Sequence, residues 1–430
     1  MTSPRILFEK VKTAVNRGDN RNSLRQATFF SGGNFLAQII MMVYAILVAR
    51  ALGPEQLGIY SGLYAILGVS ITFVNFGLDL WLLKEAHNYD SVRIITGKVL
   101  QIKLILGGAW VLLGWLILPR IRPDIYSQGL VLLAAGDVLL DVIFNTMVNA
   151  WNVQKKVRTI NIFLLISRLG KLILLLTLIN TGNVSPTSIV TSRFVVSLLV
   201  ASLSLLLVKP VLTREPLQNI VATVKGSADY GFSEILATIY ANIDVAILSF
   251  YSIGATGLYS PASGIIHALF IIPNSLHVFL LPKFSAMASK GKPKDIKQSA
   301  SRVVQIFAII GLVLSLALFL SSDFLVKTFL GNQYTSSANL LAILSPILFF
   351  KSISFGFALI IIITNNQRKR LLPQLVVSLF NIVVNLLLIP RYGVTAVAWV
   401  YVLSEVLLTL GYYLIVKKII KKAENETDEA

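Results

Sequence analysis

The sequence predicts an all-α integral membrane protein with twelve transmembrane helices, arranged as two bundles of six, and with both termini in the cytoplasm. Three observations lead to this prediction. Apolar residues make up 55% of the 430 residues, which suffices for about a dozen spans of roughly 20 residues each. Charged residues make up only 13%, against roughly 25% in soluble domains. Basic residues also alternate between successive loops, as membrane topology requires.

The composition excludes several classes of protein. So little charge is incompatible with a soluble enzyme, a disordered chain or a nucleic-acid-binding domain, and continuous apolar runs are unlike the alternating strands of an outer-membrane barrel. The net charge of +18 reflects basic cytoplasmic loops and their attraction to anionic lipids, so no nucleic-acid partner is expected. Because the chain contains no cysteine, it has no disulfide, thiolate nucleophile or cysteine-ligated metal.

Each span is expected to be a helix, because lipid offers the backbone no hydrogen-bond partners. The predicted spans of the first half are 27–49, 56–78, 99–118, 126–150, 159–179 and 187–208. Those of the second half are 229–250, 256–281, 303–320, 338–364, 371–389 and 395–416.

The distribution of Lys and Arg tests this division and sets the orientation. With the N-terminus inside, the inside segments hold 28 of the 38 basic residues, the outside loops hold five, and the spans hold five. The chain then divides into a basic N-terminal segment that can lie as an interfacial helix over residues 4–15, two bundles, a cytoplasmic linker and a cytoplasmic tail. These parts are residues 1–26, 27–208, 209–228, 229–416 and 417–430.

A short repeat relates the two bundles. The pattern G-x-Y-S occurs at residues 58–61 and again at residues 257–260, an offset of 199, and each copy opens the second helix of its bundle. Matching positions in bundles of like orientation favour an internal duplication. Paired bundles around a central cavity are a common transporter plan, in which rocking of the halves gives alternating access.

Four segments carry a family resemblance: "ARALGPEQLGIYSGLYAIL", "IDVAILSFYSIGATGLYSPASGI", "FLGNQYTSSANLLAIL" and "FNIVVNLLLIPRYGVTAVAWVYVLSE". In this order and spacing they resemble the polysaccharide transporter and O-antigen flippase family, which shares a superfamily with the multidrug and toxic-compound extrusion pumps. The resemblance covers about Ser23 to Lys417. It implies a V of two bundles around a central cavity. It also implies an undecaprenyl-diphosphate-linked sugar substrate in the cytoplasmic membrane, with glycosyltransferases and a polysaccharide polymerase as candidate partners.

Two other families fit less well. Major facilitator transporters usually carry G-x-x-x-D-R-x-G-R after their second helix, where this chain reads "KEAHNYDSVR". Lipid II flippases typically have fourteen helices and functional arginines in the first, where this chain has Ser31, Asn34 and Gln38.

Apart from Asp229 at the mouth of the seventh span, ten Asp, Glu, Lys and Arg residues lie within the predicted spans, where each charge costs at least ~2.5–3.5 kcal/mol. Lys103 and Glu234 are shallow, so Lys103 can extend to the inner surface. The resemblance makes the other cations candidates for binding the substrate diphosphate: Arg193, Lys351, Arg168 and Lys171. The other carboxylates are candidates for coupling to an ion or for pairing with these cations: Asp137, Asp141, Glu405 and Asp244.

Spacing places some of these residues together. Asp137 and Asp141 share one helix face, and Arg168 and Lys171 share a face of the next helix. One interpretation is an ion-pair network that joins the two helices, and the other is a cavity lining that binds anions; the two are compatible. Lys351 either pairs across its bundle with Glu405 or faces a wet cavity, and the cavity is preferred. Arginine suits a diphosphate because its planar guanidinium binds bidentately.

Further polar residues recur at helical spacing and predict a cavity lining, or else hydrogen bonds between helices worth ~0.6 kcal/mol each. They are Asn34, Gln38, Asn145, Asn149, His267, Asn274, Asn381 and Asn385. Two histidines ten residues apart, His267 and His277, are weak grounds for a metal site, and none is predicted.

The function predicted from these features is transport without catalysis. No serine-elbow, phosphate-loop or zinc-protease motif is present. The expected activity is flipping of a polyprenyl-diphosphate-linked oligosaccharide from the inner to the outer leaflet, with Na+ or H+ as the coupling ion and no other cofactor. A multidrug or cation antiporter is the first alternative. A membrane glycosyltransferase or polymerase is less favoured, since the longest outside loop, residues 321–337, carries only Asp323 and Lys327 as charges.

Overall fold

The computed structural model describes residues 18–86, 89–212, 217–288 and 293–428. Every regular element in these ranges is helical, which confirms the predicted all-α class. Short π or 3-10 turns occupy Val326–Leu330, Asn332–Tyr334 and Gln367–Arg370. The α-helices are α2 (Gly18–Ser70), α3 (Thr72–Asn75), α4 (Leu78–Glu85), α5 (Tyr89–Ile121), α6 (Gln128–Val153), α7 (Val157–Asn180), α8 (Pro186–Val208), α9 (Leu217–Tyr251), α10 (Ile253–Leu269), α11 (Ile271–Ala288), α12 (Pro293–Leu325), α13 (Thr335–Leu344), α14 (Pro346–Ile363) and α15 (Leu371–Asp428).

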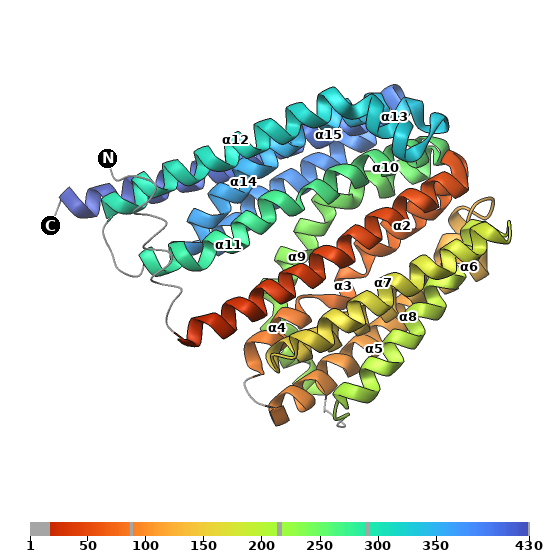
Figure 1. The fold of residues 1–430 in the computed structure, drawn as a ribbon, viewed down its shortest axis with the longest axis horizontal. Coiled ribbons are helices and arrows are strands. Elements are labelled where there is room, and N and C mark those ends of the chain that lie inside the picture. The colour runs from red at the N-terminus through yellow and green to blue at the C-terminus, as the bar shows by residue number, and fades with distance from the viewer. Residues whose placement is uncertain (1–17, 87–88, 213–216, 289–292, 429–430) are drawn as a thin grey trace.

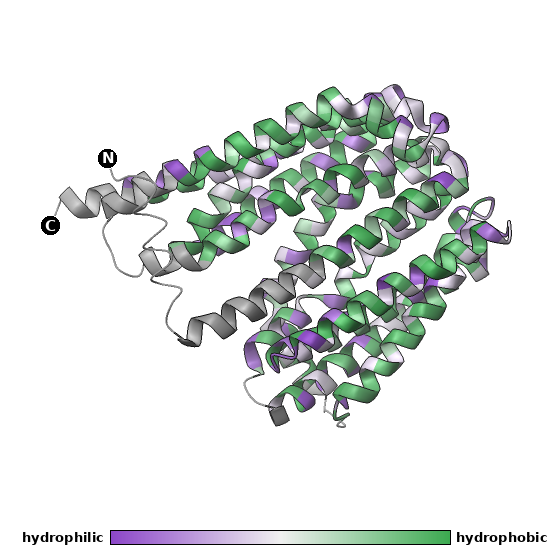
Figure 2. Ribbon diagram, viewed as in Figure 1, coloured by the Kyte–Doolittle hydropathy of each residue, from purple (hydrophilic) through white to green (hydrophobic). Residues whose placement is uncertain are grey.

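The surface of the helices is apolar. Ten helical stretches in the described ranges are long and apolar enough to cross a membrane. Large side chains such as Leu320, Phe279 and Leu206 expose 81%, 73% and 68% of their area, which a soluble protein would not tolerate over so many positions. Figure 2 shows hydrophobic residues along the lengths of the helices. The chain is therefore a multi-pass membrane protein.

The two longest helices each contain an interruption at a glycine. Gly53 (φ 72°, ψ 171°) lies inside α2 just before Pro54, and Gly393 (φ 60°, ψ −144°) lies inside α15. Both glycines adopt positive φ, which costs glycine little. After Gly53 the chain runs back toward α3 and α4 (Figure 1). The glycines separate the predicted spans 27–49 from 56–78, and 371–389 from 395–416.

The helices form two groups that diverge toward one end of the molecule (Figure 1). One group contains α3 to α8, in which α6 packs on α5 and α8; the other contains α10 to α15, in which α12 packs on α14. Helix α9 contacts α2 and α4 as well as α15, so it joins the groups. Helix α2 begins and helix α15 ends at the divergent end (Figure 1).

At the other end, here called the closed end, the two copies of G-x-Y-S meet. Ser260 Oγ donates a hydrogen bond to Ser61 Oγ at 2.9 Å. A methyl group on Gly58 would lie 1.9 Å from the carbonyl oxygen of Ile253, and one on Gly257 would lie 1.7 Å from that of Pro54. Pro54 and Ile253 are themselves 199 residues apart. The contact is therefore reciprocal, as in a two-fold symmetric interface, and it supports the duplication.

We expect Gly58→Ala or Gly257→Ala to weaken the closed end. A Cβ at either position would overlap a backbone oxygen, and overpacking of this kind costs about 1–3 kcal/mol. The melting temperature of the purified protein should fall for both variants. Gly254→Ala is the matched control, because no heavy atom lies within 4 Å of its added methyl group. Equal melting temperatures for all three variants would contradict the reciprocal contact.

Several helices extend or break where the sequence analysis did not expect it. Helix α9 begins at Leu217, so most of the segment expected as a linker (209–228) is helical; Ile220 and Val224 pack on a core that includes Leu78 and Val99. Apolar packing thus continues the helix beyond the span. Helix α15 likewise continues through most of the predicted tail, 417–430. The predicted interfacial helix over residues 4–15 lies outside the described residues.

Candidate functional site

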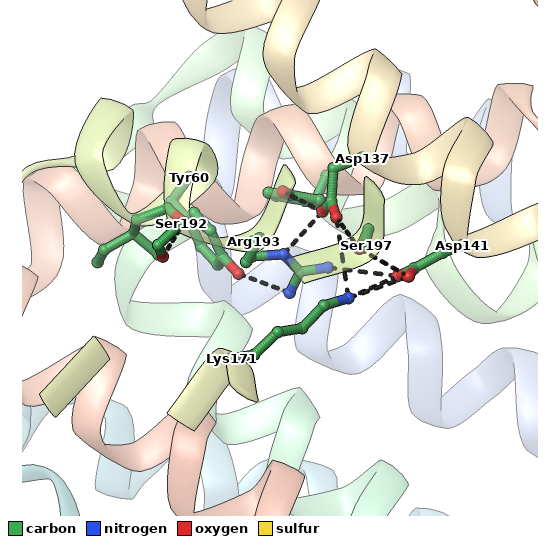
Figure 3. A network of polar contacts seen from close by, with 9 residues as sticks. Tyr60, Asp137, Asp141, Lys171, Ser192, Arg193 and Ser197 are labelled. Atoms are coloured by element: carbon green, nitrogen blue, oxygen red, sulfur yellow. Dashed lines mark hydrogen bonds and ion pairs between the residues drawn. The ribbon is translucent and has the colours of Figure 1, made fainter. Parts of the chain in front are cut away.

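A buried network of charged residues joins three helices of the first group. Arg193 of α8 places Nε 2.8 Å from Asp137 Oδ2 on α6, and its Nη1 donates to the Tyr60 hydroxyl at 3.0 Å. The guanidinium also lies over the ring of Tyr64, 4.4 Å from its centroid. Figure 3 shows Arg193 between Asp137, Asp141 and Tyr60. We call Asp137, Asp141, Lys171, Arg193, Tyr60, Tyr64 and Ser197 the first network.

Lys171 of α7 completes this arrangement. Its Nζ lies 3.0 Å from Asp141 Oδ1 and 3.8 Å from Asp137 Oδ1. Ser197 Oγ donates to both carboxylates, at 2.6 Å and 3.0 Å. The side chains of Lys171 and Asp137 are fully buried, whereas that of Asp141 is 31% exposed. The network is therefore densely hydrogen-bonded at Asp137 and more open at Asp141.

Arg168 lies one turn from Lys171 on α7 and differs from its neighbours. It is partly buried, and within the described ranges it makes no hydrogen bond or ion pair, although the charge of Asp141 acts on it. The three cations Arg168, Lys171 and Arg193 thus face two carboxylates. One positive charge remains in excess in an environment where a lone charge is costly.

A second network lies in the other group. Lys351 Nζ of α14 is 2.9 Å from Glu405 Oε1 on α15, donates to the Tyr240 hydroxyl, and lies 4.5 Å from the centroid of that ring. Glu405 is fully buried and Lys351 is 11% exposed. The structure therefore shows Lys351 in the paired alternative, because Glu405 lies close enough to neutralise it. Glu405 Oε2 is buried and has no hydrogen-bond partner among the described residues.

The other residues predicted to line the cavity or to couple to an ion lie outside the two networks. Asp244 accepts hydrogen bonds from the Tyr259 hydroxyl and from the backbone of Val245. His267 Nε2 lies 3.0 Å from the Tyr401 hydroxyl. Asn385 donates to Asn381 at 2.9 Å, and both are fully buried.

Gln38 and Asn274 are exposed, whereas Asn145 and Asn149 line a cavity. The side chain of Asn34 lies outside the described part of the structure.

Lys103 is a correction to the sequence analysis. It does not extend to the inner surface, since its side chain is fully buried and its Nζ lies 2.7 Å from Asp79 Oδ1 and 2.8 Å from Thr146 Oγ1. The ion pair with Asp79 stabilises the buried ammonium group of Lys103, which therefore does not have to reach water to keep its charge. Asp79 was missed because it lies one residue beyond the predicted span 56–78. Tyr60 belongs to the first copy of G-x-Y-S, but the repeat did not predict its contact with Arg193. Tyr64 and Tyr240 were missed because a phenol in a span gives no sequence signal.

Comparisons with known proteins agree with this architecture. The profile of a family described as polysaccharide biosynthesis protein matches residues 23–288. The "Putative O-antigen transporter" of Escherichia coli (strain K12) is 24% identical over 373 residues, which cover 81% of this chain and 86% of that protein.

Two solved structures share the fold. The lipid II flippase MurJ in an inward closed conformation has a TM-score of 0.73 at 15% identity, over 92% of this chain and 89% of that chain. An inward-facing multidrug resistance MATE family transporter of the MOP superfamily has a TM-score of 0.75 at 12% identity, over 90% and 96%.

Proposed function

The chain belongs to the polysaccharide biosynthesis protein family, and we propose that it is a flippase for polyprenyl-diphosphate-linked oligosaccharides. In this proposal the protein lies in the cytoplasmic membrane with both termini inside and moves its substrate from the inner to the outer leaflet. Counting the arms of α2 and α15 on either side of Gly53 and Gly393 separately raises the ten apolar stretches to twelve spans. An even number agrees with the start of α2 and the end of α15 lying at the same end of the molecule (Figure 1).

The observation that carries the proposal is the excess positive charge at the first network. Asp137 and Asp141 neutralise two of the three cations, and Arg168 keeps no ion pair among the described residues. An anionic headgroup would supply the missing negative charge. A diphosphate suits this position because its oxygens match the planar donors of a guanidinium. A drug or cation exporter would need excess negative charge at such a site instead.

The second network supports a role in ion coupling. Glu405 has one oxygen on Lys351 and a second buried oxygen with no hydrogen-bond partner in the described structure. Such an oxygen can accept H+ or coordinate Na+, and either would loosen the hold on Lys351. We infer that this pair converts an ion gradient into a change of conformation. Rocking about the closed end would then alternate the exposure of the first network.

Arg168→Gln tests the proposed function. Losing a charge-assisted hydrogen bond to the diphosphate is worth about 1.5–3 kcal/mol, so flipping should fall by about 10- to 100-fold. The measurement is labelling of lipid-linked sugar in the outer leaflet of vesicles that contain the purified protein. Folding should be unaffected, since Arg168 holds no ion pair in the described ranges.

Arg158→Gln on the same helix is the control, because Arg158 is exposed at the start of α7. Equal flipping by the two variants would contradict a diphosphate site at Arg168. Resistance to cationic dyes on overexpression, with unchanged surface polysaccharide, would instead support a drug exporter.

A further inference from the structure

An open cavity of about 360 Å³ lies between α3, α4, α6 and α9, and its lining residue Asn145 follows Asp141 of the first network by one turn of α6. Its polar lining consists of Asn75, Asp79, Asn145, Asn149 and Glu234, and Leu80 and Val148 provide an apolar side. Glu234 comes from α9, the helix that joins the two groups, and the other lining residues come from the first group. Such a cavity, with a few convergent polar groups and an apolar wall, is typical of a small-molecule site.

The cavity lies at a break in a predicted membrane helix. Span 56–78 is interrupted between α3 and α4, where Phe76 (φ 36°) and Gly77 (φ 69°) are left-handed. Glu234 Oε2 accepts a hydrogen bond from the Gly77 amide at 3.1 Å, and its Oε1 accepts one from Asn75. Broken helices in transporters usually occur where the backbone borders a binding cavity.

The two carboxylates of the cavity are already engaged. Asp79 Oδ1 accepts from Lys103 and, at 2.9 Å, from Thr146 Oγ1, while Glu234 holds the helix break. Lys103 neutralises the charge of Asp79. These contacts argue against a metal cation as the occupant, because its ligands would have to leave existing partners.

The amides of the cavity, by contrast, have free hydrogen-bonding groups. In the described ranges the side chains of Asn145 and Asn149 make no hydrogen bond, and Asn75 Oδ1 is buried without a partner. Each asparagine offers both a donor and an acceptor. Paired donors and acceptors beside an apolar wall match the hydroxyl groups and the carbon faces of a sugar ring.

The position of the amides relative to the charges strengthens this assignment. Asp141, Asn145 and Asn149 follow one another at intervals of four residues along one face of α6. At 1.5 Å per residue, Asn145 and Asn149 lie roughly 6 and 12 Å from Asp141 along the helix. A ligand whose charged end meets Arg168 near Asp141 would therefore place its next groups in the cavity.

We propose that this cavity binds a sugar ring of the lipid-linked substrate through the amides of Asn145 and Asn149. The proposal rests on the proposed function and adds to it a subsite that distinguishes a sugar-bearing lipid from the bare carrier. In this proposal the diphosphate binds Arg168 beside the first network, and the first sugar enters the cavity one turn further along α6.

Binding to two lipid probes tests this assignment. Native mass spectrometry of the full-length protein would compare undecaprenyl diphosphate with undecaprenyl-diphosphate-linked N-acetylglucosamine. The wild type should bind the sugar-bearing lipid at least tenfold more tightly. In Asn145→Leu/Asn149→Leu, which removes both amides, this preference should fall below twofold, while binding of the bare lipid stays unchanged. Asn152→Leu, on the same helix but outside the cavity lining, should behave as the wild type.

The outcomes separate the two proposals. If the wild type binds both lipids equally, or if the double variant keeps its preference, the sugar subsite is wrong while the flippase proposal stands. If neither lipid binds the wild type, both proposals fail. If the double variant loses both lipids alike but melts at the wild-type temperature, the amides serve the headgroup as a whole, and the assignment to a sugar is overturned.

Discussion

A disulfide between cysteines at positions 61 and 260 is expected to abolish transport. The hydroxyl oxygens of Ser61 and Ser260 are 2.9 Å apart at the closed end, and the chain has no cysteine of its own. In Ser61→Cys/Ser260→Cys, oxidation should therefore yield one defined crosslink between the two halves. The closed end then cannot open, so substrate export should fall to the background level and return when a reductant cleaves the bond.

The controls for this experiment are the two single variants, which cannot form the intramolecular bond and should export normally under oxidation. Surface polysaccharide, measured with and without reductant, reports the effect in cells. Full crosslinking combined with normal export would show that the halves need not separate at this end, and alternating access by rocking would be wrong.

Lys351→Met is expected to destabilise the protein strongly. It leaves the fully buried Glu405 without its cation, and breaking a buried pair by removing one partner costs about 3–5 kcal/mol. The double variant Lys351→Met/Glu405→Gln removes both charges and should recover most of this stability. Thermal unfolding of the purified variants, arranged as a double-mutant cycle, measures the coupling between the two side chains.

Lys327→Met provides the control for this cycle. Lys327 pairs with Asp323 at 2.7 Å, but the two side chains are 49% and 61% exposed, so the pair is worth at most about 1 kcal/mol. If Lys351→Met and Lys327→Met melt alike, Lys351 does not neutralise Glu405 as the structure indicates. Transport is a separate readout: a well-folded double variant that still responds to the ion gradient would remove Glu405 from the coupling mechanism.

The helical architecture follows from the sequence because it depends on hydropathy and on charge along the chain. The turn at Gly53-Pro54, for example, lies between the predicted spans 27–49 and 56–78, whose limits were drawn from the hydropathy of the chain. The ends of helices are harder to predict from the sequence. Helix α9 begins at Leu217, before the predicted span, because Ile220 and Val224 pack against apolar partners. Such partners come from tertiary packing, which a local pattern does not contain.

The candidate site was predictable in its residue types but not in its pairing. Asp137, Asp141, Lys171 and Arg193 stood out because charges in spans are rare, and the structure brings them together. The choice between a partner and a cavity for Lys351 depended on whether Glu405, 54 residues away, lies within 3 Å. Helical spacing relates residues within one helix only, so it cannot predict a contact between residues 54 positions apart on different helices. The cavity beside Asn75 was not foreseen either, since it depends on the helix break at Phe76 and Gly77.

The reciprocal contact of Gly58 and Gly257 has a consequence for the origin of the chain. Each glycine leaves room for a backbone carbonyl of the other half to approach closely. The two glycines occupy equivalent positions in the repeat. A half-length ancestor would have presented the same groove and the same ridge, so two copies of it would have associated face to face. The reciprocal contact is thus the geometry that duplication and fusion of a self-associating half would produce.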